Sequence, residues 1–268
     1  MKLRTFGLVL IGAASLAVLP ACKKDEAPPA PSTPTTTGQA QTPTPTPAQA
    51  QTPPAPAGKS TIRGVVKFNG APPAAADIAP STDPACEGMA LKEAAVLVKD
   101  GKLQNVLVRV KGSVAGAPAA PSTPVTVDQT KCTYAPRVQG AQVGQTIQVQ
   151  NSDQTLHNVR AVTGTKSIFN LAQPPSGPPV TKPVPTDAEL VQLKCDVHPW
   201  MKAFVVVSPH PYFATTGEDG SFSLTGLPAG TYTIEAWHET FGTKTAEVTV
   251  KDGETAETSF EFSPTDKG

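Results

Sequence analysis

The chain has 268 residues, and its 22 lysines and arginines balance 22 aspartates and glutamates, so the formal net charge is zero. A chain without a positive field has nothing to attract a phosphate backbone, which argues against sequence-independent nucleic-acid binding. Aromatic residues make up only 5% of the chain, whereas prolines number 30. This composition argues against a large helical enzyme and favours short β-strands together with a segment that forms no core.

Residues 1–21 have the pattern of a bacterial secretion signal. Two basic residues precede an apolar run over residues 6–19, which is shorter than the ~20 residues that span a bilayer. The run ends in small residues before Cys22, similar to a lipobox, in which the cysteine is acylated and becomes the first residue of the mature protein. We therefore expect a lipid anchor in the cell envelope, not a membrane span. An ordinary secreted protein is the alternative.

The resemblance to lipoprotein sorting signals also bears on location. Lysines at positions 23 and 24, in place of an aspartate, favour the outer membrane over the inner one, with the protein facing the periplasm or the cell surface. Residues 22–59 consist mostly of Pro, Thr, Ala and Gln and lack apolar periodicity, which predicts a disordered tether. At ~3.1 Å per residue in polyproline II, the tether would reach up to ~100 Å. A low-complexity tail without a role is the alternative.

Folded sequence is expected from residue 60. Apolar and polar residues alternate over residues 61–68, and Asn-Gly follows, which predicts a strand and a turn. Further strands are expected at residues 95–98, 106–110, 125–127, 147–150, 157–162, 191–193 and 204–207, and again between 213 and 262. Short strands between Gly, Pro, Asn and Asp turns are typical of β-sandwiches. We expect an all-β chain with one domain over residues 60–212 and a second, small β-sandwich over residues 213–268.

The chemistry of the chain is concentrated in residues 195–201. Cys195, His198 and Met201 place a thiol, an imidazole and a thioether just before a predicted strand. A thiolate, two imidazoles and a weak axial thioether form the trigonal site that holds copper for one-electron transfer. The second imidazole has to come from elsewhere, and His157 stands at the head of another predicted strand. A sandwich can bring the two segments together at one end.

The pattern Cys-x-x-His-Pro-aromatic-Met, preceded by Asn-Ser-Asp…His-Asn-Val, resembles the cupredoxins, with ligand spacing closer to amicyanin than to plastocyanin. The resemblance implies a cupredoxin-like Greek-key β-sandwich and one type 1 copper ion. It implies as ligands His157, Cys195, His198 at the solvent edge and Met201 in the axial position. Supporting positions are Asn158, which ties the ligand loops together, and Pro199. The chain departs from the family in lacking an aromatic residue before Cys195 and in a long Pro-rich loop over residues 170–187.

Other interpretations of these residues stay open. Zinc accepts Cys and His equally well, and a degenerate cupredoxin without metal would use the same loop only for structure. Trp200 is either a structural plug or an aromatic beside His198 that docks a redox partner protein. In cupredoxins that histidine presents its ring edge to solvent within an apolar patch, which favours the docking role.

The remaining cysteines fit an oxidising compartment. With Cys22 lipidated and Cys195 on the metal, Cys86 and Cys132 are left, and parity predicts a disulfide between them. Two free buried thiols are the alternative. Such a bond would contribute ~3 to 4 kcal/mol and would join the strands before residue 130 to the cupredoxin-like core.

The C-terminal block has the pattern Asp-Gly-x-Phe-x-Leu…Leu-Pro-Ala-Gly-Thr-Tyr over residues 219–232. It resembles carboxypeptidase regulatory-like, transthyretin-like sandwiches, which implies an accessory domain without catalytic residues. Two further histidines, His210 and His238, lie near it. Each is either a ligand of a second metal site or a hydrogen-bonded residue at a domain interface.

These features favour a membrane-anchored blue copper protein that exchanges single electrons with a redox protein of the envelope. We do not expect an enzyme, because the sequence has no paired carboxylates in a strand or helix context, no Gly-x-Ser-x-Gly motif and no phosphate-binding loop. Two alternatives remain. A surface adhesin that binds glycans would use the Cys195 loop only for structure, and a periplasmic copper-binding or delivery protein would use the same ligands with exchangeable metal.

Overall fold

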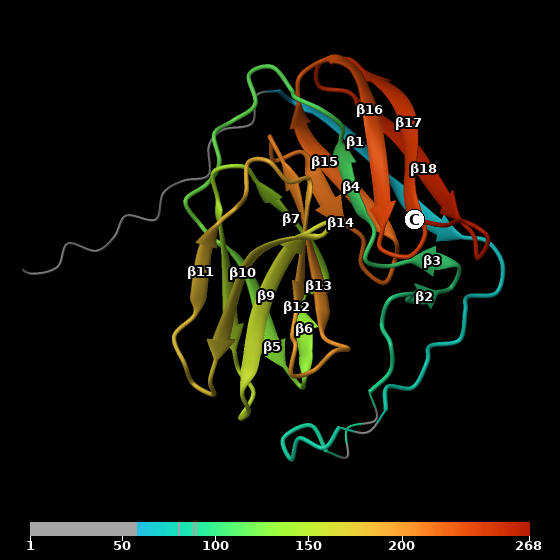
Figure 1. Cartoon of the computed structure of the whole chain (residues 1–268). Helices are drawn as coiled ribbons and strands as arrows, with labels where there is room; N and C mark the ends of the chain where they lie inside the picture. Colours follow the sequence, from blue (N-terminus) through green and yellow to red (C-terminus); the bar gives the residue numbers. More distant parts are fainter. Residues whose placement is uncertain (1–57, 80, 88, 90) are drawn as a thin grey trace, which may run out of the picture. The chain divides into compact units, whose positions relative to one another are not determined.

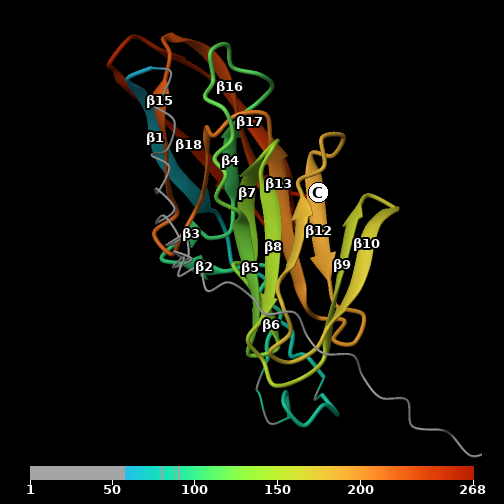
Figure 2. The ribbon, with the colours of Figure 1, turned by 90° about the vertical axis from the view of Figure 1, so that its left-hand side faces the viewer.

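The computed structural model describes residues 58–268 apart from 80, 88 and 90. The predicted signal sequence, the predicted lipidation site Cys22 and the tether up to residue 57 lie outside the described residues. The described chain consists of strands, turns and loops without a helix, as Figures 1 and 2 show, so the predicted all-β class is confirmed. Within this part of the chain, no helix is long and apolar enough to cross a membrane.

The central part of the described chain is a β-sandwich, called here the first sandwich. Its sheets have the strand orders β10-β9-β12-β13-β7 and β11-β8-β5-β6. The first sheet contains β7 (Val138–Gln142), β9 (His157–Thr163), β10 (Lys166–Gln173), β12 (Leu190–Lys194) and β13 (Lys202–Ser208), and the second contains β5 (Val125–Thr130), β6 (Thr133–Ala135), β8 (Thr146–Asn151) and β11 (Val180–Pro183). Strands β7 and β13 pair in parallel, as do β5 and β8, so neighbours in space are distant along the chain, as in Greek-key sandwiches.

Alternation along the strands builds the core of the first sandwich. In β8, Ile147 and Val149 are buried while Thr146, Gln148 and Gln150 are partly exposed, as a period of two requires. Strand β11 and the last part of β10 lie within residues 170–187, where the sequence predicted a loop. Most residues of β10 are exposed, so no apolar alternation announces this strand. It forms because its backbone pairs with β9, which Figure 2 shows beside it.

The second sandwich combines strands from both ends of the described chain. One sheet has the order β15-β1-β3-β2 with β18 also paired to β1, and the other has the order β14-β4-β16-β17. These strands are β1 (Ser60–Phe68), β2 (Val98–Lys99), β3 (Lys102–Leu103), β4 (Leu107–Val110), β14 (Phe213–Thr215), β15 (Ser221–Leu227), β16 (Gly230–His238), β17 (Gly242–Val250) and β18 (Thr255–Phe262). The aromatic residues Phe68, Phe222 and Phe262 lie in one core with Ile62 and Leu224.

The position of β1 differs from the expectation that the strands near residue 60 extend the first domain. This strand lies between β15 and β18, antiparallel to the former and parallel to the latter. Its inward residues Ile62 and Val66 fill the core of the second sandwich. A Cβ at Gly64 would lie 1.5 Å from the carbonyl oxygen of Thr258, so only glycine allows β18 to approach this closely. Burial of the β1 face therefore assigns it to the C-terminal strands.

The two sandwiches are joined by a small apolar cluster and by buried ions. Leu107 of β4 packs with Val138 and Phe204 of the first sandwich. Arg109, also on β4, donates to the Val207 carbonyl of β13 at 2.8 Å and to Glu235 of β16 at 2.8 Å. Arg109 is 8% exposed, and its buried charge is stable there because the guanidinium donors are paired.

His210 and His238 are buried near these contacts. The His210 ring accepts a hydrogen bond from the Tyr212 amide at 3.2 Å, and the His238 ring accepts one from the Thr240 amide at 3.1 Å. Among the described residues, neither belongs to a cluster of side chains placed to hold a metal. Of the two interpretations given from the sequence, this arrangement favours hydrogen-bonded structural residues.

Candidate metal centre

Adjacent strands of the first sandwich bring the predicted ligands together. Strand β9 begins at His157, and β12 ends immediately before Cys195. The two strands are antiparallel with Lys194 opposite Arg160, so the start of β9 lies beside the residues that follow β12. His198 lies in the turn between β12 and β13. The sandwich thus gathers these side chains at one end.

Three donor atoms form a small buried triangle. The Nδ1 atoms of His157 and His198 are 2.9 Å apart. The Sγ atom of Cys195 lies 3.8 Å from Nδ1 of His157 and 3.7 Å from Nδ1 of His198. The three residues are 0%, 1% and 2% exposed for His157, His198 and Cys195 respectively. One cation placed among these atoms would be shielded from water.

The triangle fits a metal ion of the size found in protein sites. Metal bonds of about 2.0–2.1 Å to imidazole nitrogen and about 2.3 Å to sulfur, at about 120°, separate the two donors by about 3.8 Å. The two separations between sulfur and nitrogen agree with this value, whereas the 2.9 Å between the two nitrogens is shorter than the same geometry gives and corresponds to an angle of about 90° at the metal. A trigonal set of two histidines and one cysteine suits copper more than a hard cation.

Each histidine is held from behind by a carboxylate that the sequence analysis missed. Nε2 of His157 lies 3.0 Å from Oδ2 of Asp153, and Nε2 of His198 lies 3.1 Å from Oδ2 of Asp83. A ring that donates its Nε2 proton to a carboxylate presents the lone pair of Nδ1 to the metal. Asp153 stands in the Asn-Ser-Asp turn that the cupredoxin pattern includes, which was a usable signal. Asp83 precedes a cysteine distant in sequence, and nothing there indicates a ligand.

Burial and hydrogen bonds shift the pKa values of these groups in directions that suit metal binding. Burial lowers the pKa of His157, although Asp153 acts against it. The hydroxyl of Thr155, which donates to Asp83 at 2.6 Å, is the main cause that lowers the pKa of that carboxyl. At neutral pH the site therefore holds a neutral His157 imidazole and an ionised Asp83 carboxylate.

Asn158 connects β9 to the loop that carries the cysteine. Its Oδ1 accepts hydrogen bonds from the backbone amides of Asp196 at 2.6 Å and Val197 at 3.3 Å. The same oxygen lies 3.5 Å from Sγ of Cys195, which donates to it in the thiol form. The structure therefore places Asn158 between the two ligand segments, where the cupredoxin resemblance expected it.

Met201 and the two residues before it have different environments. Met201 is 1% exposed and lies in the same apolar cluster as Cys195. Pro199 is exposed. Trp200 is half-buried, with its ring centroid 5.1 Å from that of His198, and its indole nitrogen donates to the Cys132 carbonyl at 2.8 Å. The indole is thus pinned to the backbone beside the ligand.

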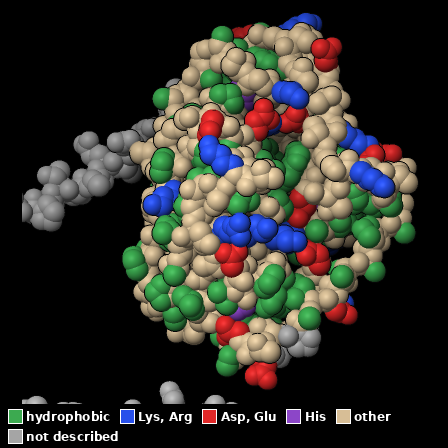
Figure 3. All heavy atoms as spheres, viewed as in Figure 1, with side chains coloured by type: hydrophobic (Ala, Val, Ile, Leu, Met, Phe, Trp, Pro, Cys, Tyr) green, Lys and Arg blue, Asp and Glu red, His purple; other side chains and the backbone are tan. Residues whose placement is uncertain are grey.

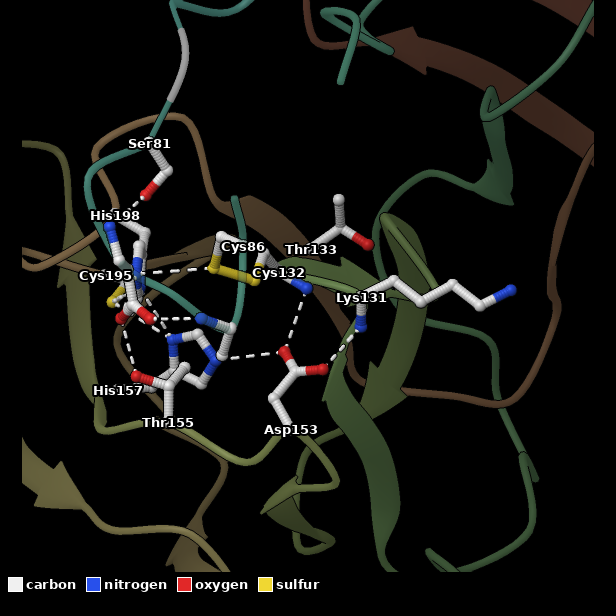
Figure 4. Close-up of a disulfide and its surroundings, with 12 residues drawn as sticks. Ser81, Cys86, Lys131, Cys132, Thr133, Asp153, Thr155, His157, Cys195 and His198 are labelled. Atoms are coloured by element: carbon white, nitrogen blue, oxygen red, sulfur yellow. Dashed lines mark hydrogen bonds and ion pairs between the residues drawn. A yellow bond between two sulfur atoms is a disulfide. The ribbon is translucent and has the colours of Figure 1, made fainter. Parts of the chain in front are cut away.

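The expectation that His198 faces solvent is wrong. The ring is 1% exposed because residues 81–87, called here the cap, lie against it. The predicted disulfide between Cys86 and Cys132 is confirmed, and Sγ of Cys86 lies 3.6 Å from Nε2 of His198. Figure 4 shows the disulfide between the two histidines on one side and Lys131 on the other. The segment before the first sandwich therefore covers the ligand that was predicted to be open.

Comparisons with known proteins give one family match and several similar solved structures. Residues 198–263 match the family of carboxypeptidase regulatory-like domains. Among solved structures, a purple cupredoxin from Nitrosopumilus maritimus is 22% identical with a TM-score of 0.28, and the match covers 31% of this chain and 99% of that one. A reduced amicyanin variant is 23% identical with a TM-score of 0.29, covering 38% of this chain and 98% of that one.

A copper-containing nitrite reductase from Thermus scotoductus is 22% identical with a TM-score of 0.29, and the match covers 37% of this chain but 25% of that protein. No curated protein matches the chain. The chain therefore contains a carboxypeptidase regulatory-like region at residues 198–263, and the cluster of His157, Cys195 and His198 lies in the first sandwich.

Proposed function

We propose that this chain is a lipid-anchored type 1 copper protein of the bacterial cell envelope that transfers one electron at a time between protein partners. The observation that carries the proposal is the buried triangle of His157 Nδ1, Cys195 Sγ and His198 Nδ1. Met201 is buried in the same cluster and is the candidate axial ligand. A thiolate, two imidazoles and a weak thioether are the donor set of copper sites for electron transfer.

Copper bound among these residues would supply a reversible change between Cu(I) and Cu(II). The chain contributes donors that need not move, because carboxylates hold the outer nitrogens of both histidines and Asn158 holds the loop of Cys195. The buried donors also keep water away. Chemistry on a substrate needs an open ligand position instead. We therefore propose a carrier and not an enzyme.

The alternatives are less well supported. Copper delivery would use the same ligands but needs metal that leaves easily, and the three donor residues are buried. Zinc would accept the cysteine and the histidines, so the metal must be identified by its spectrum. A glycan-binding adhesin would give no role to three donor atoms within 4.8 Å of one another.

The anchor and the partner are proposals from the sequence pattern. A diacylated Cys22 would hold the protein at the membrane, and mass spectrometry of the mature protein from membranes tests this. Recovery of a soluble form with an unmodified Cys22 thiol would contradict it. On the face in Figure 3, acidic and basic side chains are interspersed. We therefore expect docking of a redox protein to depend weakly on ionic strength.

Reconstitution with Cu(II) tests the central proposal. We expect an intense visible band from thiolate to copper, with the matching electron paramagnetic resonance spectrum, and loss of both in Cys195→Ser. His157→Gln should weaken or abolish the band, whereas His210→Gln, a change at a buried histidine outside the triangle, should leave it intact. A folded wild-type protein that stays colourless with Cu(II), or that retains only Zn(II), would overturn the proposal.

A further inference from the structure

The cap reaches the metal centre from a part of the chain far away in sequence. Asp83 Oδ2 lies 3.1 Å from Nε2 of His198, across 115 residues of chain. Cys86 Sγ lies 3.6 Å from the same nitrogen. Together with the ring of Trp200, these groups surround the outer edge of the imidazole, which is 1% exposed.

Besides its contact with His198, Asp83 accepts hydrogen bonds from two donors. The Thr155 hydroxyl donates to its Oδ2 at 2.6 Å, and the Ala85 amide donates to its Oδ1 at 2.9 Å. Thr155 stands two residues before His157, so the cap contacts the segments of both histidine ligands. The carboxylate is thereby aimed at His198 and is not a free surface charge.

The disulfide connects this arrangement to the support of the other histidine. Cys132 donates its amide to Asp153 Oδ2 at 2.9 Å, and the same oxygen lies 3.0 Å from Nε2 of His157. The Cys132 carbonyl accepts the hydrogen bond of Trp200. The disulfide therefore fixes the cap through Cys86, and through Cys132 it is hydrogen-bonded to Asp153, the carboxylate beside His157.

Among the residues that the structure describes, few other contacts hold the segment that contains the cap. Residues 71–77 are exposed, and Asp77 pairs with Lys92 in an isolated bridge and an exposed ion pair. Glu93 forms an ion pair with Arg137 of the first sandwich at 2.8 Å. Without the disulfide, the main constraints on Asp83 would be its own hydrogen bonds to Thr155 and His198.

We propose that Asp83 is a positioning residue for the metal ligand His198. The Cys86–Cys132 disulfide keeps Asp83 in place and holds the cap over the metal centre. This inference rests on the proposed function, because it takes His198 as a ligand. Asp83 keeps the Nδ1 lone pair directed at the metal, and the cap keeps competing ligands in solution from reaching the imidazole. Carboxylates behind ligating histidines typically change metal affinity by about 10- to 100-fold when removed.

The test measures how fast the full chain, loaded with Cu(I), loses metal to an excess of a chromogenic Cu(I) chelator. We expect Asp83→Asn and the double variant Cys86→Ser with Cys132→Ser each to lose copper at least about tenfold faster than wild type. Glu87→Gln removes the same charge from an exposed residue of the cap, so its rate should equal that of wild type. Asp83→Glu should restore part of the slow exchange.

Two further readouts separate positioning from general stability. The metal-free Asp83→Asn protein should melt near the wild-type temperature, while the Cu(II) band of its loaded form shifts. Adding Asp83→Asn to the disulfide variant should change the rate little, because Asp83 is already displaced there. Equal rates in all variants, or a fully additive effect, would overturn the inference. If wild type binds no copper at all, the proposed function has failed instead.

Discussion

The two histidines of the metal centre are supported in the same way by different parts of the chain. Behind His157 stands Asp153, four residues earlier in the turn between β8 and β9. Behind His198 stands Asp83, which belongs to the cap and is separated from it by 115 residues. The first support needs only a local turn, whereas the second needs a long segment and a disulfide. A sandwich that carried only β5 to β13 would hold one of its two histidines less firmly.

Asp153, the support of His157, is itself held by two residues with left-handed backbone. Lys131 and Cys132 have φ angles of 52° and 54°, which are uncommon for residues other than glycine. Their amides donate to Asp153 at 2.6 Å and 2.9 Å. Successive amides in this conformation form a concave anion site. Asp153 therefore satisfies the turn that carries Cys132 as well as His157, whereas Asp83 serves one ligand.

Removing the disulfide that holds the cap is expected to lower the stability of the protein most. The bond closes a separation of 46 residues, for which chain entropy gives about 4 kcal/mol. Cys86→Ser with Cys132→Ser should lower the free energy of unfolding of the metal-free protein by up to this amount. Denaturant titration measures it, and wild type under reducing conditions is the control. An unchanged midpoint would show that other contacts hold the cap.

The next largest change in stability is expected at low pH, from a buried histidine outside the metal centre. Burial is the main cause that lowers the pKa of His238 from 6.5 to about 4, and the charge of Arg137 acts in the same direction. Because the folded state has the lower pKa, the unfolded chain takes up the proton first, and stability is lost as the pH falls from 6.5 to about 4. The loss is on the order of 3 kcal/mol. His238→Gln should flatten this part of the stability profile, and an unchanged slope would contradict the assignment.

The two aspartates should differ in what they stabilise. Asp153→Asn weakens charge-assisted bonds to two amides and to His157, so we expect a loss of about 2 to 3 kcal/mol in the metal-free protein. Asp83→Asn should cost about 1 kcal/mol there, because its effect is directed to the loaded site. Thermal and denaturant unfolding of both variants measure the difference. Equal losses would mean that the cap is as much a part of the fold as the local turn.

The smallest effect is expected at Trp200. Trp200→Phe keeps a ring beside His198 but loses the hydrogen bond to the Cys132 carbonyl, which should cost about 1 kcal/mol. The Cu(II) band should be nearly unchanged. If electron exchange with the physiological partner slows while the band stays intact, Trp200 also serves as the docking contact. Loss of metal binding would identify it as a structural plug.

Much of the architecture could be predicted from the sequence because its signals are local. Alternation of apolar and polar residues predicts strands such as β8. The Cys, His and Met of the ligand loop occur at a spacing that is typical of only a few kinds of site. Parity of the cysteines was enough to pair Cys86 with Cys132. Strands without alternation, such as β10, could not be predicted, because their stability comes from a neighbour and not from their own side chains.

By itself the sequence determined the all-β class, the two resemblances and the residues that form the donor triangle, because each depends on the order of residue types within a short window. Only the tertiary structure decided that β1 belongs between β15 and β18 and that Asp83 lies behind His198. Both contacts join segments more than 100 residues apart. They form because burial of the β1 face and the disulfide offset the entropy that is lost when those segments come together. Free energies that arise between distant segments leave no pattern in a short stretch of sequence.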